Sequence, residues 1–202
     1  MPQQVDHKRV LGLELPTDPR WVNMAEISLE DILTDHAFCE LKAASQCISL
    51  ISLYPHKKEL VEQVSPVVTE EWGHFRMVVR ELDKRGLTLG NQRKDIYVNE
   101  LLKFQKKGGT LDDRLLEKLM TFALIEARSC ERFRLLSLHI ADDSLKEFYH
   151  KFMVSEAGHY KMFLELAKLY FSEEIALNRW KEYLDFEADL MQRLETRGDR
   201  MH

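Results

Sequence analysis

Apolar residues recur along most of this chain at the spacing of amphipathic helices, and no segment sustains the alternation of a β-strand. A helix over 173–196 shows this clearly, with an apolar face formed by Ile175, Trp180, Leu184, Leu190 and Leu194. Longer helical patterns precede it over about 28–54, 57–85, 112–140 and 144–171. The pattern therefore predicts an all-α protein.

Capping and breaking residues give these helices approximate boundaries. Capping boxes are indicated at two starts, by Ser28 with Asp31 and by Ser144 with Glu147. Pro55 ends the first long helix, and Gly86 ends the second. The Ser65-Pro66 pair interrupts the second, where the helix either restarts with Ser65 as its cap or kinks.

The remaining segments are connections. Residues 1–27 read as an irregular lead-in containing Pro16 and Pro19. Residues 87–111 form a long crossover with a short helix near 95–105. We therefore expect a single domain over 1–202, a four-helix bundle of two helical hairpins joined by that crossover, with an extra C-terminal helix over 173–196.

Composition agrees with one soluble, packed domain. The 202 residues are 45% hydrophobic and 31% charged, which is typical of globular chains. No run of about 18 uncharged apolar residues indicates a membrane span. The polar start lacks a signal region, and the odd set Cys39, Cys47 and Cys130 contains no C-x-x-C pair. We expect buried, reduced thiols and a cytoplasmic protein.

A seven-residue repeat carries the candidate chemistry. Residues 71–77 read EWGHFRM and residues 156–162 read EAGHYKM. Each copy places a glutamate and a histidine three residues apart on one helix face, as Glu71 with His74 and Glu156 with His159. Such a pair can bind one metal ion. Gly73 and Gly158 precede the two histidines, which close helix approach, space beside a metal or simple duplication would explain.

The first helix of each hairpin supplies a partner carboxylate among apolar neighbours. Glu40 lies fifteen residues before Pro55, and Glu71 lies sixteen after it. Glu126 and Glu156 each lie fifteen residues from Ala141. At about 1.5 Å per residue, each carboxylate lies roughly 22 Å from its turn. Antiparallel packing then brings four carboxylates and two imidazoles to one height in the bundle.

This constellation predicts a two-metal site. The predicted ligands are one Glu from each of two helices and a Glu-x-x-His from each of the others: Glu40, Glu71, His74, Glu126, Glu156 and His159. Oxygen-rich donors without a thiolate favour iron or manganese over structural zinc.

Several neighbours are ambiguous. His36 lies one turn before Glu40, where it is either a second-shell residue or a satisfied polar side chain. We expect Glu131 to form an ion pair rather than bind metal, and Glu70 to point away from the site. Tyr160 aligns with Phe75, which favours packing.

The ligand layout resembles the ferritin-like di-iron carboxylate proteins. Within that group, the paired E-x-G-H-[FY]-[RK]-M motifs and the chain length resemble the tRNA 2-methylthio-N6-isopentenyladenosine hydroxylase family over nearly the whole chain. The resemblance implies an O₂-dependent monooxygenase that hydroxylates the isopentenyl group of a modified adenosine beside the tRNA anticodon. It also implies two iron ions on the six predicted ligands and an external electron donor, a reductase or ferredoxin.

Charge gives partial support for an RNA partner. The chain carries a net charge of −5, yet residues 84–107 carry seven basic and two acidic side chains. The candidate tRNA contacts are the basic ones: Lys84, Arg85, Arg93, Lys94, Lys103, Lys106 and Lys107. A local basic face can bind phosphates despite a negative mean charge. The alternative is a solvated, lysine-rich crossover.

Two other functions remain open at this point. The chain could be a di-iron or di-manganese oxidoreductase acting on a small substrate or peroxide. It could also be a non-catalytic iron-binding or storage protein.

Overall fold

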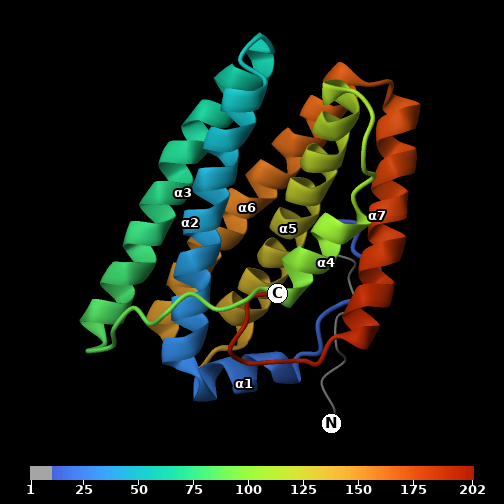
Figure 1. Ribbon diagram of the computed structural model, residues 1–202. Coiled ribbons are helices and arrows are strands. Elements are labelled where there is room, and N and C mark those ends of the chain that lie inside the picture. The colour runs from blue at the N-terminus through green and yellow to red at the C-terminus, as the bar shows by residue number, and fades with distance from the viewer. Residues whose placement is uncertain (1–10) are drawn as a thin grey trace.

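The computed structural model describes residues 11–202, which form seven helices and no strand within that range. Figure 1 shows their arrangement. Their bounds are α1 Arg20–Ile27, α2 Leu29–Leu53, α3 Lys58–Lys84, α4 Ile96–Phe104, α5 Leu111–His139, α6 Asp143–Tyr170 and α7 Glu173–Arg193.

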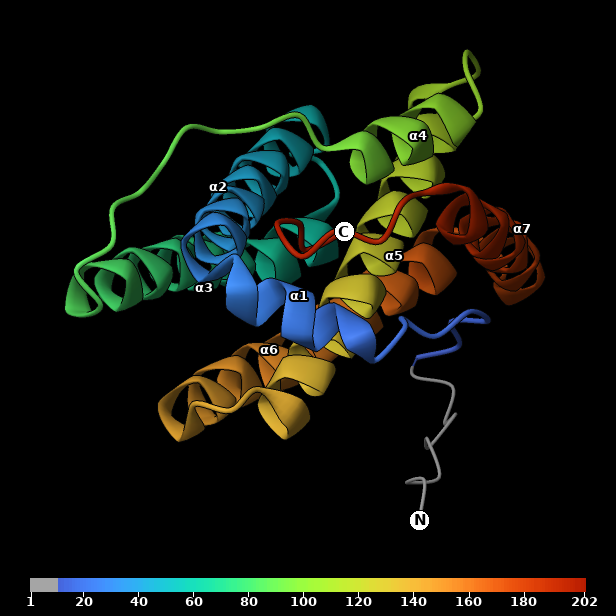
Figure 2. The same cartoon turned by 90° about the horizontal axis from the view of Figure 1, so that it is seen from below.

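The helices pack as two hairpins with a crossover. α2 lies along α3 and α5 along α6, and α3 also contacts α6 (Figures 1 and 2). The crossover passes from the end of α3 to α4, and α7 packs against α5 and α6. The predicted ferritin-like bundle with an additional C-terminal helix is confirmed. No helix in the described part is long and apolar enough to cross a membrane.

Two apolar clusters fill the bundle, one on each side of a polar layer. One cluster includes Leu50, Leu119 and Phe163, near the turn between α2 and α3. The other includes Trp21 and Phe133, near α1. On each of the four long helices, the predicted ligands lie between residues of one cluster and residues of the other. The fold therefore places the ligands in a layer with apolar packing on both sides.

The start of the chain differs from prediction. Residues 20–27, expected to be irregular, form α1, which buries Trp21, Val22 and Ala25. Ser28 makes no capping hydrogen bond through its side chain, so the predicted capping box is wrong. The helix was missed because eight residues carry little periodicity and Pro19 marks its start rather than a loop. Residues 1–10 of the expected lead-in lie outside the described range.

α3 runs through Pro66 without a restart. Ser65 is therefore no cap, and its hydroxyl donates to the carbonyl of Val61. Pro66 and Glu62 both face solvent, where water can hydrate the carbonyl that the proline leaves without an amide donor.

The start of α6 also differs by a few residues. The cap is Asp142, whose carboxylate accepts from the backbone amides of Ser144 and Leu145. The predicted cap at Ser144 is wrong, because an aspartate two residues earlier satisfies the same helix-end amides.

Candidate metal centre

The structure brings the six predicted ligands together at one level of the bundle. Their donor atoms form two groups, each within 4.8 Å: Glu40, Glu71, His74 and Glu156 in one, and Glu71, Glu126, Glu156 and His159 in the other. Glu71 and Glu156 belong to both groups. The two groups therefore share these carboxylates, whereas Glu40 belongs only to the first and Glu126 only to the second.

The two histidines reach across helices as well as along them. Nδ1 of His159 lies 2.8 Å from Oε1 of Glu71 and 3.3 Å from Oε2 of Glu156. Nδ1 of His74 lies 3.3 Å from Oε2 of Glu40 and 3.6 Å from Oε2 of Glu71. Each imidazole thus faces the shared carboxylates with its Nδ1 atom.

Burial and mutual repulsion make the carboxylates hard to ionise together. Burial and the nearby Glu71 and Glu156 raise the pKa of Glu40 well above its usual value. Burial and Glu156 do the same to the pKa of Glu126. Burial also opposes ionisation of Glu71, but contacts with His159 and His74 outweigh it and lower its pKa. The side chains of this layer alone therefore favour the protonated forms of Glu40 and Glu126.

The donor set fits a pair of cations. Two of the buried ligand atoms have no hydrogen-bond partner: Nδ1 of His74 and Oε1 of Glu156. Unpaired buried polar atoms are costly, and a coordinated ion would satisfy them. Burial alone would lower the pKa of His159, but hydrogen bonds to Glu156 and Glu71 raise it to about 12, so a metal would displace a proton there.

His36 lies directly behind Glu40. Its Nε2 atom is 2.8 Å from Oε1 of Glu40, and its ring is fully buried against Phe133, Tyr149 and Phe152. Burial lowers the pKa of His36 well below its usual value, so the ring is neutral. This position suits the second-shell alternative.

Glu70 was expected to point away, and that prediction is wrong. Its Oε2 atom lies 2.9 Å from Nε2 of His159, on the side of the ring opposite the candidate ions. Glu70 comes from α3 and His159 from α6, so sequence spacing alone could not reveal the contact. A carboxylate in this position orients an imidazole ligand.

The other neighbours behave largely as expected. Glu131 pairs with Arg128 at 3.1 Å, although the pair is buried and also binds Thr17. The ring of Tyr160 packs against Trp180. A Cβ atom at Gly73 or Gly158 would meet nothing within 4 Å, so close helix approach does not explain these glycines.

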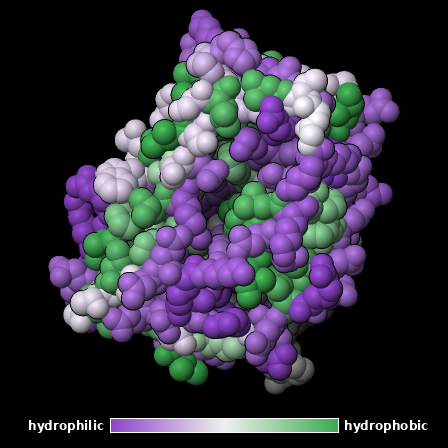
Figure 3. Space-filling view, viewed as in Figure 1, coloured by the Kyte–Doolittle hydropathy of each residue, from purple (hydrophilic) through white to green (hydrophobic). Residues whose placement is uncertain are grey.

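A cavity of about 360 Å³ leads from the surface to the candidate metal centre. The hollow between α2 and α5 is visible in Figure 3. Apolar side chains line much of it, including Ala43, Val98, Leu102, Phe122, Ile125 and Phe163. Glu126 also lines the cavity, whereas Glu40 does not. Polar lining residues include Lys42, Gln46, Gln92, Arg93, Lys94, Asp95, Asn99 and His202.

The predicted basic residues do not form one continuous face. Lys84 and Arg85 lie at the end of α3, where they pair with Glu81, and Arg85 also pairs with Asp142. Arg93 pairs with Asp31 and Asp199.

The other basic residues lie around α4. Lys94 lines the cavity, Lys103 pairs with Glu100, Lys106 pairs with Glu182, and Lys107 donates to the carbonyl of Leu102. Lys42, at the same cavity, was missed because it lies in a long helix rather than in a basic run.

Comparison with known proteins identifies relatives of the whole chain. The family described as tRNA-(MS[2]IO[6]A)-hydroxylase (MiaE) matches residues 4–202. A relative from Pseudomonas putida, named tRNA 2-(methylsulfanyl)-N(6)-isopentenyladenosine(37) hydroxylase, is 37% identical over 80% of this chain and 77% of its own length. A protein of the same name from Salmonella typhimurium is 28% identical over 89% of this chain and 83% of its own.

One solved structure has closely similar architecture. It is described as Protein 43 with aldehyde deformylating oxygenase activity from Synechococcus. It superposes with a TM-score of 0.87 and 32% identity, covering 94% of each chain. The match over nearly the full length, with the confirmed bundle, shows that the chain belongs to the tRNA-(MS[2]IO[6]A)-hydroxylase family of enzymes.

Proposed function

We propose that this enzyme hydroxylates the isopentenyl group of a 2-methylthio-N6-isopentenyladenosine in tRNA, using O₂ and two iron ions. The observation that carries the proposal is the cavity that ends on Glu126. Family membership supports a hydroxylated tRNA base as the product. Because the proposed substrate is tRNA, we also propose that the enzyme is cytoplasmic.

Six side chains would hold the ions in this proposal. Glu40 with His74 and Glu126 with His159 would each serve one ion, and Glu71 and Glu156 would bridge them. Iron, when bound, supplies the reductive activation of O₂ that a C–H hydroxylation requires. Carboxylate and imidazole donors suit that metal. Electrons come from a separate reductase or ferredoxin.

The cavity suits a prenyl chain on a polar base. Its apolar lining near Phe122, Ile125 and Phe163 would receive the isopentenyl group and exclude water from the reacting carbon. Its polar lining, with Lys42 and Lys94, would face the base and the backbone. The substrate base must leave its stack to enter, as in other enzymes that modify a base.

A second candidate is an oxygenase acting on an apolar aldehyde. The Synechococcus structure favours it, because that protein is described by such an activity and shares 32% identity with this chain. The apolar part of the cavity would accept an alkyl chain equally well.

One experiment separates the two. The iron-loaded protein is reduced without oxygen, then exposed to O₂ with isopentenylated tRNA or with a medium-chain aldehyde. We expect mass spectrometry to find nucleoside heavier by one oxygen atom in the first reaction. An intact, iron-loaded protein that leaves the tRNA unchanged but shortens the aldehyde would establish the second candidate.

A further inference from the structure

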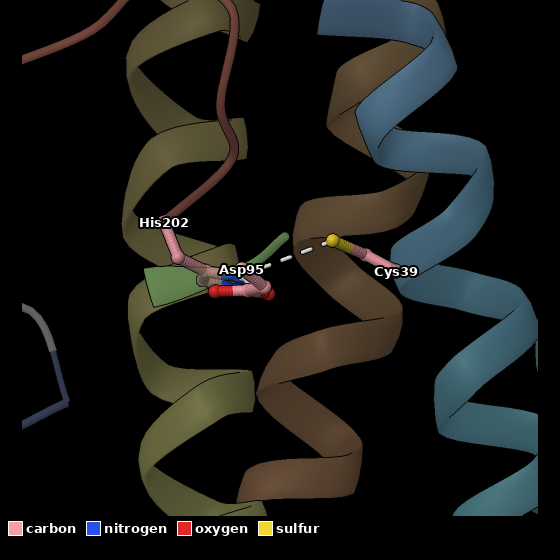
Figure 4. Close-up of side chains that lie close together, drawn as sticks. All are labelled: Cys39, Asp95 and His202. Carbon is pink, nitrogen blue, oxygen red and sulfur yellow. Dashed lines mark hydrogen bonds and ion pairs between the residues drawn. The ribbon is translucent and has the colours of Figure 1, made fainter. Parts of the chain in front are cut away.

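Three polar side chains from distant parts of the chain meet at the wall of the cavity. Figure 4 shows Cys39 of α2, Asp95 before α4 and His202 of the C-terminal segment. Nδ1 of His202 lies 3.7 Å from Oδ2 of Asp95 and 3.9 Å from Sγ of Cys39. All three residues line the cavity that contains Glu126.

The segment 194–202 holds His202 firmly in this wall. After α7 it turns back across the bundle beside α1 (Figures 1 and 2). The indole of Trp21 donates to the carbonyl of Arg197 at 2.9 Å, and the buried Met201 donates its amide to Asp35 at 2.8 Å. A Cβ atom at Gly198 would clash with the backbone of Met24 at 2.3 Å. The segment therefore has little freedom to move away.

The ring of His202 is fixed on two sides. It stacks on Tyr97, with centroids 5.2 Å apart and planes at 15°. Its Nε2 atom lies 2.9 Å from the hydroxyl oxygen of Ser129. Only 2% of its side chain is exposed. With Nε2 hydrogen-bonded to Ser129, the other ring nitrogen, Nδ1, faces Asp95 and Cys39.

Asp95 is held as a carboxylate. One oxygen accepts from the amide of Val98 at 3.0 Å, and the other lies 3.2 Å from the ammonium of Lys42. Burial would raise the pKa of Asp95, but the contacts with His202 and Lys42 outweigh it and hold the pKa below its usual value. The oxygen that faces His202 is Oδ2, which already accepts from Lys42, and a carboxylate oxygen has room for a second hydrogen bond.

A gap separates these two groups. Their 3.7 Å distance is too long for a direct hydrogen bond. When the Nε2 proton of His202 is donated to Ser129, Nδ1 is also an acceptor. In that tautomer the two acceptors share one stretch of the cavity wall, and an N–H group placed between them can donate to both.

We propose that Asp95 and His202 recognise the exocyclic N–H of the substrate's base. This inference rests on the proposed function, in which the isopentenyl chain is attached to that same nitrogen. Ser129, which contacts His202, lies three residues after Glu126 on α5. Positions three apart on a helix are about 5–6 Å apart, similar to the length of a four-carbon chain. The anchored N–H would thus leave the chain directed toward Glu126.

A metal ion is the other partner that could fill the gap, since thiol, carboxylate and imidazole all bind metals. The structure disfavours it, because the Lys42 ammonium already lies beside Asp95. A second cation would meet repulsion from that ammonium.

The test compares two synthetic anticodon stem-loops. One carries the natural isopentenylamino base. The other carries an isopentenyl ether at the same carbon, which keeps the chain but lacks the N–H. We expect the wild-type enzyme to prefer the amine by about ten- to a hundredfold in kcat/KM, the range for losing one hydrogen bond to a charged group. In Asp95→Asn, which can still cap α4, and in His202→Ala, this preference should fall below about threefold.

Control variants separate recognition from general damage. Asn99→Ala lines the same cavity outside the cluster and should leave the preference intact even if turnover falls. Gly198→Ala should displace the 194–202 segment and lower the preference with both irons retained.

Three results would overturn the inference. Equal use of both probes by the wild type, or an unchanged preference in the Asp95 and His202 variants, would remove it while leaving the proposed function intact. A third bound metal ion that His202→Ala loses would replace it with a metal site. A loaded wild-type enzyme that hydroxylates neither probe would reject the proposed function as well.

Discussion

Glu40 and Glu126 occupy equivalent positions in the two hairpins, yet their surroundings differ. One turn before Glu40 lies His36, buried among aromatic rings and in contact with that carboxylate. One turn before Glu126 lies Phe122, which lines the cavity. The cavity therefore reaches the Glu126 end of the centre, here called the open side, and not the Glu40 end.

The repeated motifs differ in the same way. Nε2 of His159 is hydrogen-bonded to Glu70, which immediately precedes Glu71 on α3. The matching position before Glu156 is Ser155, a shorter and neutral side chain. The duplication thus supplies similar ligand atoms to both groups, whereas residues outside the repeat make one side differ from the other.

The largest expected effect comes from removing a terminal carboxylate on either side. Glu126→Ala and Glu40→Ala should each lower iron content below two per chain and reduce turnover by at least about a thousandfold, since metal chemistry supplies several kcal/mol. Iron analysis with the tRNA assay measures both. Glu165→Ala, at an exposed position of α6, is the control. Full retention of two irons in Glu126→Ala would contradict the ligand assignment.

Narrowing the open side should reduce turnover without removing metal. Phe122→Trp adds volume inside the cavity, and we expect kcat/KM to fall by about 10–200-fold with both irons retained. The reason is steric, since Phe122 lies beside the route to Glu126. Leu138→Trp makes a comparable change on an exposed part of α5 and should have no effect. Unchanged turnover in Phe122→Trp would place substrate entry elsewhere.

These contrasts show what the sequence could and could not reveal. The four long helices and the six candidate ligands were predictable because helix period, turn position and each copy of the seven-residue repeat lie within local segments. The contacts of Glu70 with His159 and of Asp95 with His202 join residues 89 and 107 positions apart. No local pattern encodes such pairs. α1 was not predicted because the sequence of a short helix next to prolines resembles that of a loop.

The asymmetry around the two histidines predicts unequal metal affinity. Glu70→Gln keeps the shape of the side chain but weakens its support of His159, so we expect about tenfold weaker binding at one of the two ions. Anaerobic titration with Fe(II) should then show two binding steps whose dissociation constants lie further apart than those of the wild type. Glu62→Gln, an exposed change on the same helix, is the control. Equally weakened binding of both ions would show that the two metal positions are coupled rather than independent.

The centre itself should respond to pH alike on both sides. The pKa values of Glu40 and Glu126 are raised in the metal-free fold, so their protonated forms stabilise it below about pH 4.5. That stability is lost as pH rises through the folded pKa values. A bound metal replaces the protons, so Mn(II) should raise the Tm more at pH 8 than at pH 5. We expect the increase in Tm on adding Mn(II) to be about 5 °C larger at pH 8.

Matched variants test this symmetry. Glu40→Gln and Glu126→Gln each remove one titrating carboxylate. Each should therefore reduce, by a similar amount, the difference between the Mn(II)-induced increases in Tm at pH 8 and pH 5. Thermal melting monitored by circular dichroism at both pH values measures it. If only one variant reduces this pH-dependent difference, Glu40 and Glu126 themselves are not equivalent.

The smallest effect concerns charge around the open side. Lys103, Lys106 and Lys107 lie near α4, and the first two pair with Glu100 and Glu182. Because these carboxylates compete with phosphates, reversing all three charges should weaken tRNA binding only about three- to tenfold and flatten its salt dependence. Reversal of Lys151 and Lys161, which are exposed on α6, is the control. A salt slope that both sets change equally would mean that tRNA does not favour the open side.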